Sequence, residues 1–146
     1  MKTLMIAAAL AVVPPSWVPT ASAQDSSYTP GSYWEVSMLS IEPGQEENYA
    51  DYLAANWKRS QEFAKRKGWI EDYHVLANSN PRDGEPDLYL LVRFNEMTTR
   101  AQERTREREY NDFMKTTTRD SVAASGERVK MRTQMGSMLL RELMLK

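Results

Sequence analysis

The sequence predicts an α+β fold in which a four-stranded antiparallel sheet carries helices on one face. Three observations support this prediction. Apolar residues alternate with polar ones over residues 32–41, which is typical of a half-buried strand. Over residues 45–67 apolar residues recur at spacings of three and four, which indicates an amphipathic helix. Further strand-like and helix-like segments follow, so that the order becomes strand, helix, strand, strand, helix, strand.

The first strand covers residues 32–41, where Trp34, Val36 and Met38 alternate with polar residues before a Pro-Gly pair ends the strand. The helix over residues 45–67 has acidic residues in its first turn and basic residues in its last turn, as the helix dipole favours. Its apolar stripe consists of Tyr49, Tyr52, Leu53, Trp57, Phe63 and Ala64. Gly68 is the expected C-terminal cap.

The second strand is predicted over residues 69–77, and the polar stretch 78–86 is predicted to be a long turn. The third strand covers residues 87–94. Its apolar residues are continuous rather than alternating, which is typical of a strand buried on both faces.

The charged run from Arg100 to Glu109 predicts an exposed loop or helix start with mixed charges, for which a solvated face is favoured over a docking surface. The same helix, or a second one, continues through Tyr110 and Val122, and Gly126 is expected to break it. The segment 127–134 fits one more helical turn. The last strand, over residues 135–145, is again apolar on both faces.

This order of elements is the split βαβ, or ferredoxin-like βαββαβ, arrangement, here predicted as a single domain over residues 32–146. Its antiparallel sheet should carry both helices on one face and leave the other face in water. The third and fourth strands are apolar on both sides, so that face would expose more apolar surface than a monomer usually tolerates. The sequence therefore predicts a two-fold homodimer in which the open sheet faces pack together.

The N-terminus has the organisation of a secretory signal peptide. Lys2 precedes an apolar run over residues 4–13, prolines follow, and small residues occupy positions 21–23. The apolar run is too short to span a bilayer. We expect cleavage after Ala23, a disordered lead-in over residues 24–31, and a periplasmic or secreted protein without membrane attachment after cleavage.

Composition narrows the possible functions. The chain has no cysteine and one histidine, and its net charge is −1. Disulfides and thiolate metal sites are excluded, and most zinc sites need more His or Cys ligands. Bulk charge gives no reason for binding to nucleic acid. The glycines do not form a phosphate-binding loop. No metal or cofactor is expected.

Five short runs resemble the dimeric α/β-barrel superfamily, and most closely its small exported bacterial members without an assigned activity. The runs are Tyr49-x-x-Tyr52-Leu53-x-x-x-Trp57-Lys58, Lys67-Gly68-Trp69-Ile70, Tyr73-His74-Val75-Leu76, Asp87-Leu88-Tyr89-Leu90, and Gly136 through Arg141-Glu142-Leu143. The resemblance implies the ferredoxin-like fold and the dimer. The superfamily includes cofactor-free monooxygenases, polyketide cyclases, isomerases, haem-degrading enzymes and haem peroxidases. None of its catalytic motifs is matched, so the resemblance implies no catalytic residue.

His74 is the candidate catalytic residue, because an imidazole in a strand can act as a general base or bind haem iron. Strand alternation places it on one face with Asp72 and Leu76, opposite Tyr73 and Val75. The competing interpretation is a packing or interface residue.

Five aromatic residues are candidates for binding a small flat apolar ligand between helices and sheet, where tyrosine hydroxyls would orient it. They are Trp57, Tyr49, Tyr52, Tyr73 and Tyr89. The competing interpretation is that these residues form the core, because aromatic side chains supply much of the buried area of a small domain.

Two weaker metal patterns are also present. Met131, Met135 and Met138 resemble a thioether cluster for copper(I), although methionine more often fills gaps in a core. The acidic residues within 83–87 do not match the spacing of a calcium loop.

Three functional hypotheses follow. The first is an exported homodimeric domain that binds a small apolar or aromatic molecule. The second is an enzyme, a cofactor-free monooxygenase, cyclase or isomerase that uses His74 with Trp57 and a tyrosine. The third is a structural or interaction module whose aromatic residues form the core.

Overall fold

A computed structural model describes residues 26–146 of the chain. The predicted signal peptide, its cleavage site after Ala23, and residues 24 and 25 lie outside the described residues. No helix within residues 26–146 is both long and apolar enough to cross a membrane.

The strands are β1 (Tyr28–Ile41), β2 (Asp72–Ala77), β3 (Leu88–Phe94) and β4 (Arg132–Leu145). They form one sheet in the order β2-β3-β1-β4, and every neighbouring pair is antiparallel. The prediction of an α+β fold with a four-stranded antiparallel sheet is confirmed, and the arrangement is compatible with a ferredoxin-like fold.

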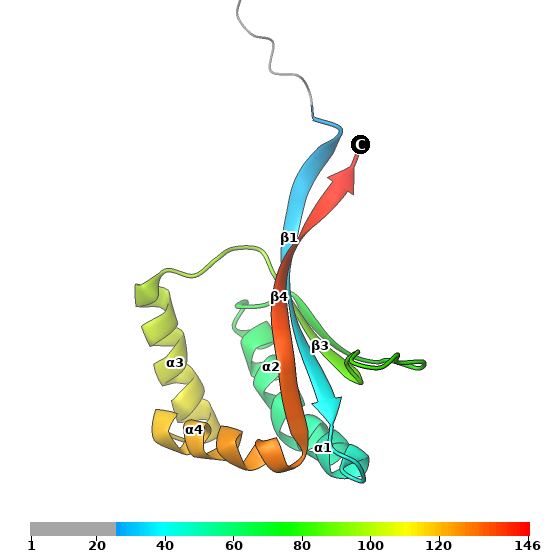
Figure 1. Cartoon of the computed structure of the whole chain (residues 1–146). Helices are drawn as coiled ribbons and strands as arrows, with labels where there is room; N and C mark the ends of the chain where they lie inside the picture. Colours follow the sequence, from blue (N-terminus) through cyan, green and yellow to red (C-terminus); the bar gives the residue numbers. More distant parts are fainter. Residues whose placement is uncertain (1–25) are drawn as a thin grey trace, which may run out of the picture.

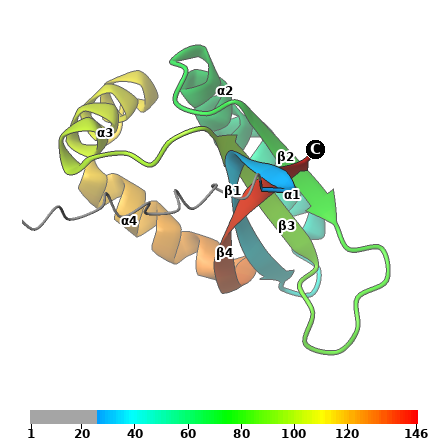
Figure 2. The same cartoon turned by 90° about the horizontal axis from the view of Figure 1, so that it is seen from above.

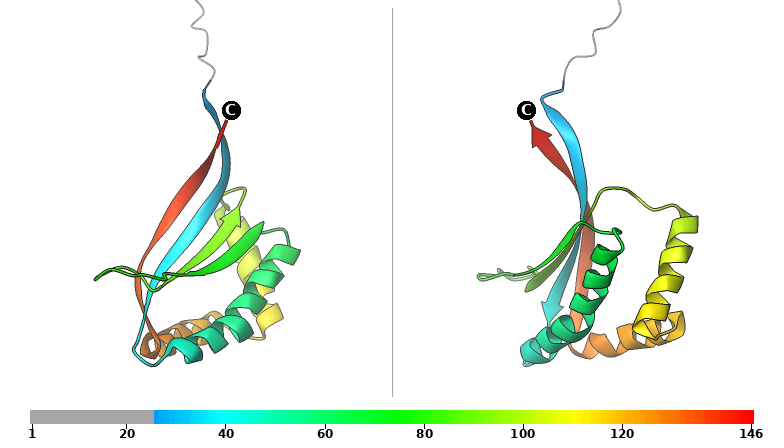
Figure 3. Two further views of the ribbon diagram at one scale, coloured as in Figure 1. Left: turned by 90° about the vertical axis from the view of Figure 1, so that its right-hand side faces the viewer. Right: turned by 180° about the vertical axis from the view of Figure 1, so that it is seen from behind.

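Helical segments cover one side of this sheet (Figure 3). They are α1 (Glu46–Tyr52), the π-helical turn η1 (Leu53–Trp57), α2 (Lys58–Arg66), α3 (Arg100–Met114), α4 (Thr118–Glu127) and the 3₁₀ turn η2 (Arg128–Lys130). The first three run on without a break and correspond to the helix predicted over residues 45–67.

The core forms where α1 and η1 pack on the centre of the sheet. Leu39 of β1 and Leu90 of β3 contribute from the sheet, and Tyr49 and Leu53 contribute from the helices. Leu39 and Tyr49 are each 2% exposed. The helical spacing of Tyr49 and Leu53 places both side chains on the apolar face that meets the sheet.

β1 begins at Tyr28, earlier than the predicted start at residue 32. Residues 28–31, expected within a disordered lead-in, pair with β4. Pro30 fits there because β3 pairs with β1 only from Tyr33 onward, so its missing N–H costs no bond to β3. β1 and β4 thus form a two-stranded arm that extends beyond the rest of the sheet (Figure 1).

The second helical region breaks earlier than predicted. Gly126 lies within α4, whereas the chain turns between α3 and α4. Lys115 adopts a left-handed conformation with φ 55°, and Thr117 starts α4 by a reciprocal capping box with Asp120. The capping hydroxyl and carboxylate satisfy backbone N–H groups that a continuous helix would not expose.

The second strand begins at Asp72 rather than at residue 69. Gly68 has φ 69° and ends the preceding helix, as predicted. Trp69 then packs edge-on against Phe63 of α2, with ring centroids 5.2 Å apart, instead of entering the sheet. The polar loop between β2 and β3 projects away from α3 and α4 (Figure 2).

The sheet surface opposite the helices, here called the open face, carries apolar residues from all four strands together with Asp72, His74 and Arg93. Residues directly opposite each other in an antiparallel pair share a face, so the register defines three rows. The rows are Leu76, Tyr89, Met38 and Gly136; His74, Leu91, Val36 and Met138; and Asp72, Arg93, Trp34 and Leu140. Leu76 is 52% exposed and Leu140 is 48% exposed. The sequence predicts apolar residues on both sides of β3 and β4. For the side that forms the open face, this prediction is confirmed.

Candidate functional site

A cleft of about 360 Å³ lies between the α1–η1–α2 segment and the α3–α4 pair. We call it the interhelical cleft. Its lining residues are Tyr52, Asn56, Trp57, Ser60, Tyr110, Met114, Lys115, Thr116, Ser121, Ala124 and Arg128. The volume falls within the range of small-molecule sites. The lining combines three aromatic rings, those of Tyr52, Trp57 and Tyr110, with a larger number of polar side chains.

One wall of the interhelical cleft is built on the π-helical turn η1. Tyr52 immediately precedes this turn, and Asn56 and Trp57 lie within it. A π-helical turn widens the helix locally and changes the direction of the side chains that follow. Such turns occur frequently at functional sites.

The opposite wall has a second backbone irregularity. Lys115 is the single non-glycine residue with positive φ among residues 26–146. For a lysine this conformation costs energy that the surrounding structure must offset. It ends α3 directly after Met114 and turns the chain so that Thr116 also lines the cleft.

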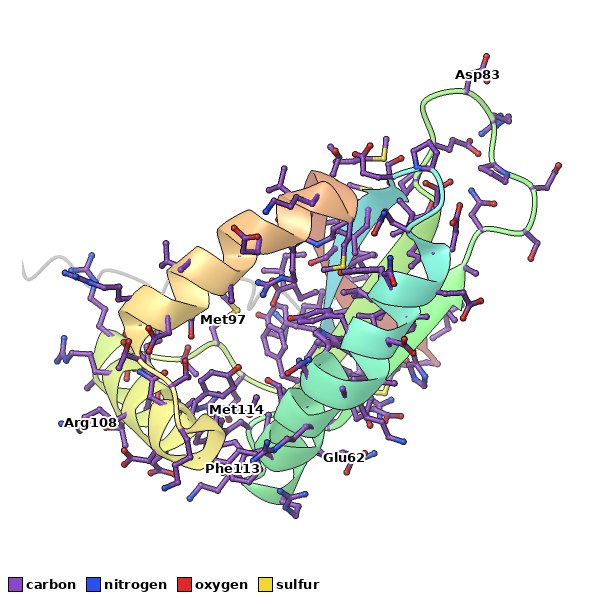
Figure 4. All side chains as sticks on the ribbon, turned by 90° about the horizontal axis from the view of Figure 1, so that it is seen from below. Glu62, Asp83, Met97, Arg108, Phe113 and Met114 are labelled. Atoms are coloured by element: carbon purple, nitrogen blue, oxygen red, sulfur yellow. The ribbon has the colours of Figure 1, made fainter. Side chains whose placement is uncertain are left out.

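α3 is held to α2 by stacked aromatic rings. Phe113 lies on Phe63 with ring centroids 4.3 Å apart, and the guanidinium of Arg59 lies 5.1 Å from the Phe113 ring. Figure 4 shows Phe113 and Met114 at the end of α3 nearest to α2, whereas Arg108 points away from it. An ion pair between Lys67 and Glu109 adds a second link.

Tyr49 and Tyr52, both predicted ligand-binding residues, have different environments. Tyr49 is buried in the core, and burial raises the pKa of its phenol despite the opposing charge of Arg132. Tyr52 stacks on Tyr49 at 5.7 Å and also lines the cleft, where the guanidinium of Arg128 lies 5.0 Å from its ring. Tyr49 therefore supports the wall that Tyr52 presents.

Trp57 and Tyr73 meet edge-on, with ring centroids 5.4 Å apart. The Tyr73 hydroxyl donates a short hydrogen bond to the carboxylate of Glu62 on α2. That hydrogen bond and, secondarily, desolvation raise the pKa of Tyr73 to about 12. Tyr73 thus remains protonated and fixes the position of Trp57, but it does not line the interhelical cleft.

His74 and Tyr89 lie on the open face, on the other side of the sheet from Trp57 and the cleft. The His74 ring stacks on Trp34 with centroids 6.2 Å apart, and its Nε2 lies 3.4 Å from Asp72. The hydrogen bond from Lys65, and then that from a backbone N–H, lowers the pKa of Asp72. The structure therefore does not bring His74 together with Trp57 and a tyrosine, as the enzyme hypothesis requires.

The residues of the two weaker metal patterns do not lie together in the structure. Met131 packs against the core on the helix side, whereas Met138 lies on the open face opposite Val36. Within residues 83–87, Asp87 accepts hydrogen bonds from the Ser40 hydroxyl and the Ile41 N–H, and Asp83 lies at the tip of the loop in Figure 4. Among residues 26–146, no group of three His, Cys, Asp or Glu side chains is placed to hold a metal ion.

A second groove, of about 450 Å³, lies between α1 and the β2–β3 edge. It is larger than the interhelical cleft, but Asp87, which lines it, is already engaged by Ser40 and Ile41. Of the π-helical turn η1 only Leu53 reaches it, and none of its lining residues is aromatic or has positive φ. We therefore regard the interhelical cleft as the stronger candidate site.

Comparison with known protein families, curated proteins and solved structures finds no match for this chain. The site is therefore defined by its own geometry. Sequence reasoning identified Tyr52 and Trp57 and missed the opposite wall, which includes Tyr110, Met114 and Arg128. The one local signal for that wall was the Thr-x-x-Asp capping pattern from residue 117, which marks the turn between α3 and α4.

Proposed function

We propose that this chain is a small-molecule-binding domain that takes a flat apolar or aromatic ligand into the interhelical cleft. One observation carries the proposal. Two backbone irregularities, η1 and the left-handed Lys115, converge on a cleft with aromatic walls from Tyr52, Trp57 and Tyr110. Strained conformations persist where a function requires a particular side-chain placement.

Titration of the mature chain with naphthamide, a neutral flat probe, tests this proposal. We expect chemical-shift changes in NMR spectra to concentrate at the indole of Trp57 and at residues of η1. Tyr110→Leu should weaken binding by about 2- to 10-fold, because an aromatic contact contributes about 0.5–1.5 kcal/mol beyond its buried area.

Tyr28→Leu is the matched control, because Tyr28 is an exposed tyrosine in the arm, away from the cleft. Its affinity for naphthamide should equal that of the unmodified chain. Absence of saturable binding, or equal losses in both variants, would contradict the proposal and favour a structural or interaction module.

We also propose that two copies associate through their open faces, in the manner of a dimeric α/β barrel with the ferredoxin-like topology. Support comes from the apolar residues that all four strands contribute to that face, and from the position of the helices of residues 26–146 on the other side of the sheet (Figure 3). A second copy is the occupant we favour, because a two-fold axis brings the same apolar rows onto themselves. His74 and Trp34 would then be interface residues.

Native mass spectrometry of Met138→Asp tests the dimer. Met138 lies in the central row and is 41% exposed, so a buried aspartate there should convert a dimer into a monomer. Val122→Asp is the control, since Val122 is 68% exposed on α4 and away from the sheet. A monomeric unmodified chain at micromolar concentration would contradict the proposal.

Finally, we propose that the chain is exported and functions in the periplasm or outside the cell. Support comes from the charged, apolar and small-residue order of residues 1–23. N-terminal sequencing of protein from its own host should find Gln24 as the first residue. An intact Met1 on the exported protein would contradict the cleavage.

A further inference from the structure

The interhelical cleft carries charge of one sign. Lys115 and Arg128 are the only charged residues among those that line it, and both are cationic. Its remaining polar lining consists of neutral hydroxyl and amide groups, among them Ser60, Thr116 and Asn56. A ligand in this cleft therefore meets a positive potential, although the chain as a whole has a net charge of −1.

Arg128 is placed to meet a planar anion. Its guanidinium lies 5.0 Å from the Tyr52 ring. Within residues 26–146 its side chain makes no ion pair, since no carboxylate lies within 4.0 Å of it. Contact with the ring restrains the position of the guanidinium, and with no carboxylate bound to it the group can donate two N–H bonds to a carboxylate ligand.

Lys115 supplies a second cation at the same site. Its backbone conformation is the strained one described above, and its side chain makes no ion pair in the described part of the chain. Lys65 and Lys67 at the end of α2, by contrast, pair with Asp72 and Glu109. The strained position thus holds a lysine whose charge no neighbour neutralises.

We propose that the ligand of the interhelical cleft is an aromatic carboxylate. Its ring would lie against Tyr52, Trp57 and Tyr110, and its carboxylate would accept hydrogen bonds from Arg128 with Lys115 nearby. This inference rests on the proposed function and adds the charge of the ligand to it. Aromatic contacts select the flat body, and the paired cations select the anion over a neutral molecule of the same shape.

Parallel calorimetric titrations of the mature chain with naphthoate and naphthamide test the proposal. The two probes share a ring system and differ in charge. We expect naphthoate to bind at least about 10-fold more tightly at low salt, because a hydrogen bond to a charged group contributes more than a neutral one. Added salt should reduce this preference.

Arg128→Gln should abolish the preference for naphthoate, measured as the ratio of the naphthoate and naphthamide affinities of the same variant. Lys115→Gln should reduce the preference for naphthoate. Because the Lys115 side chain is exposed, this variant should fold and can replace Arg128→Gln in the test if Arg128→Gln does not fold. Arg119→Gln is the control, because Arg119 is an exposed cation of α4 that does not line the cleft.

The outcomes separate the two proposals. Equal affinity for naphthoate and naphthamide overturns the carboxylate inference and leaves the aromatic site intact. A preference that persists in both Arg128→Gln and Lys115→Gln also overturns it, because the anion then binds elsewhere. If neither probe binds, the proposed function itself fails.

Discussion

Phe113 of α3 lies almost parallel to Phe63 of α2, with an interplanar angle of 11° and ring centroids 4.3 Å apart. Cations from α2 lie over the same Phe113 ring, at 5.1 Å for Arg59 and 5.7 Å for Arg66. One aromatic side chain thus anchors a helix whose first half, from Arg100 to Thr105, is exposed on every side. The width of the interhelical cleft depends on this contact.

Phe113→Ala should release α3 from α2. Loss of the stacked pair and its cations should lower the free energy of unfolding by about 1–3 kcal/mol. Amide hydrogen exchange should accelerate over residues 100–114 more than in the sheet. Arg108→Ala is the control, because Arg108 points away from α2 (Figure 4). Unchanged exchange in α3 of the Phe113 variant would show that other contacts hold the helix.

Leu39→Ala should destabilise the whole domain. Leu39 is 2% exposed at the centre of the core, where truncation of a leucine typically costs about 2–5 kcal/mol through lost burial and a residual cavity. Urea denaturation should show a lower midpoint with an unchanged slope. Met97→Ala, at a residue that is 59% exposed, should change stability by about 0.5 kcal/mol or less. Equal effects of the two substitutions would contradict the assignment of the core.

Stability should fall between pH 10 and pH 12 because of Tyr73. The Glu62 carboxylate raises the pKa of Tyr73 to about 12 from the ordinary value of 10.0. The folded chain therefore retains a proton that the unfolded chain has lost. The resulting stabilisation is fully present below pH 10 and disappears as the pH rises through 12.

Glu62→Gln tests this pH dependence. A neutral acceptor should return the pKa of Tyr73 towards 10.0, which tyrosine absorbance titration measures, and should flatten the decline in stability over this pH window. Asp51→Asn, at an exposed residue of α1, should leave both unchanged. An unaltered tyrosine titration in the Glu62 variant would refute the role of this hydrogen bond.

Substitution of two glycines by alanine should change stability in opposite directions. Gly136 lies beside a register shift between β1 and β4, with φ 149°, and an added Cβ would come 3.3 Å from the Met38 methyl group. Gly136→Ala should therefore cost about 1–3 kcal/mol. Gly126 is helical with open space around it, so Gly126→Ala should stabilise by about 0.5–1 kcal/mol. Thermal unfolding of both variants measures the difference, and two changes of the same sign would contradict the assigned conformations.

Local sequence patterns were sufficient to predict the elements whose apolar residues recur at a regular spacing. The strand around Trp34 and the helix from residue 45 follow their periods closely, so both were predicted within a few residues apart from the earlier start of the strand. Pro30 and Gly31 resemble chain breakers, and only the partner strand β4 explains why residues 28–31 are extended. The face of His74 was not predictable, because β2 has apolar residues on both sides and only tertiary packing distinguishes them.

For a similar reason, only one wall of the candidate site could be predicted from the sequence. Tyr52 and Trp57 belong to the apolar stripe of one predicted helix, since Tyr52 lies three residues after Tyr49 and Trp57 four residues after Leu53. Arg128 lines the same cleft as Tyr110 because the chain turns at Lys115, where a lysine adopts a conformation that its residue type disfavours. Such a turn is a property of the assembled helices, and no local periodicity encodes it.

The pairing of Tyr28 with Leu145 has a consequence for how the molecule forms. β1 is a central strand, and one of its two neighbours, β4, is the last of the four strands of this sheet to be synthesised. Contacts between segments so distant in sequence are slow to form, because a long loop must close before they contribute stability. Until β4 has been synthesised, β1 presents an unpaired edge, so the nascent chain is vulnerable to self-association during that interval.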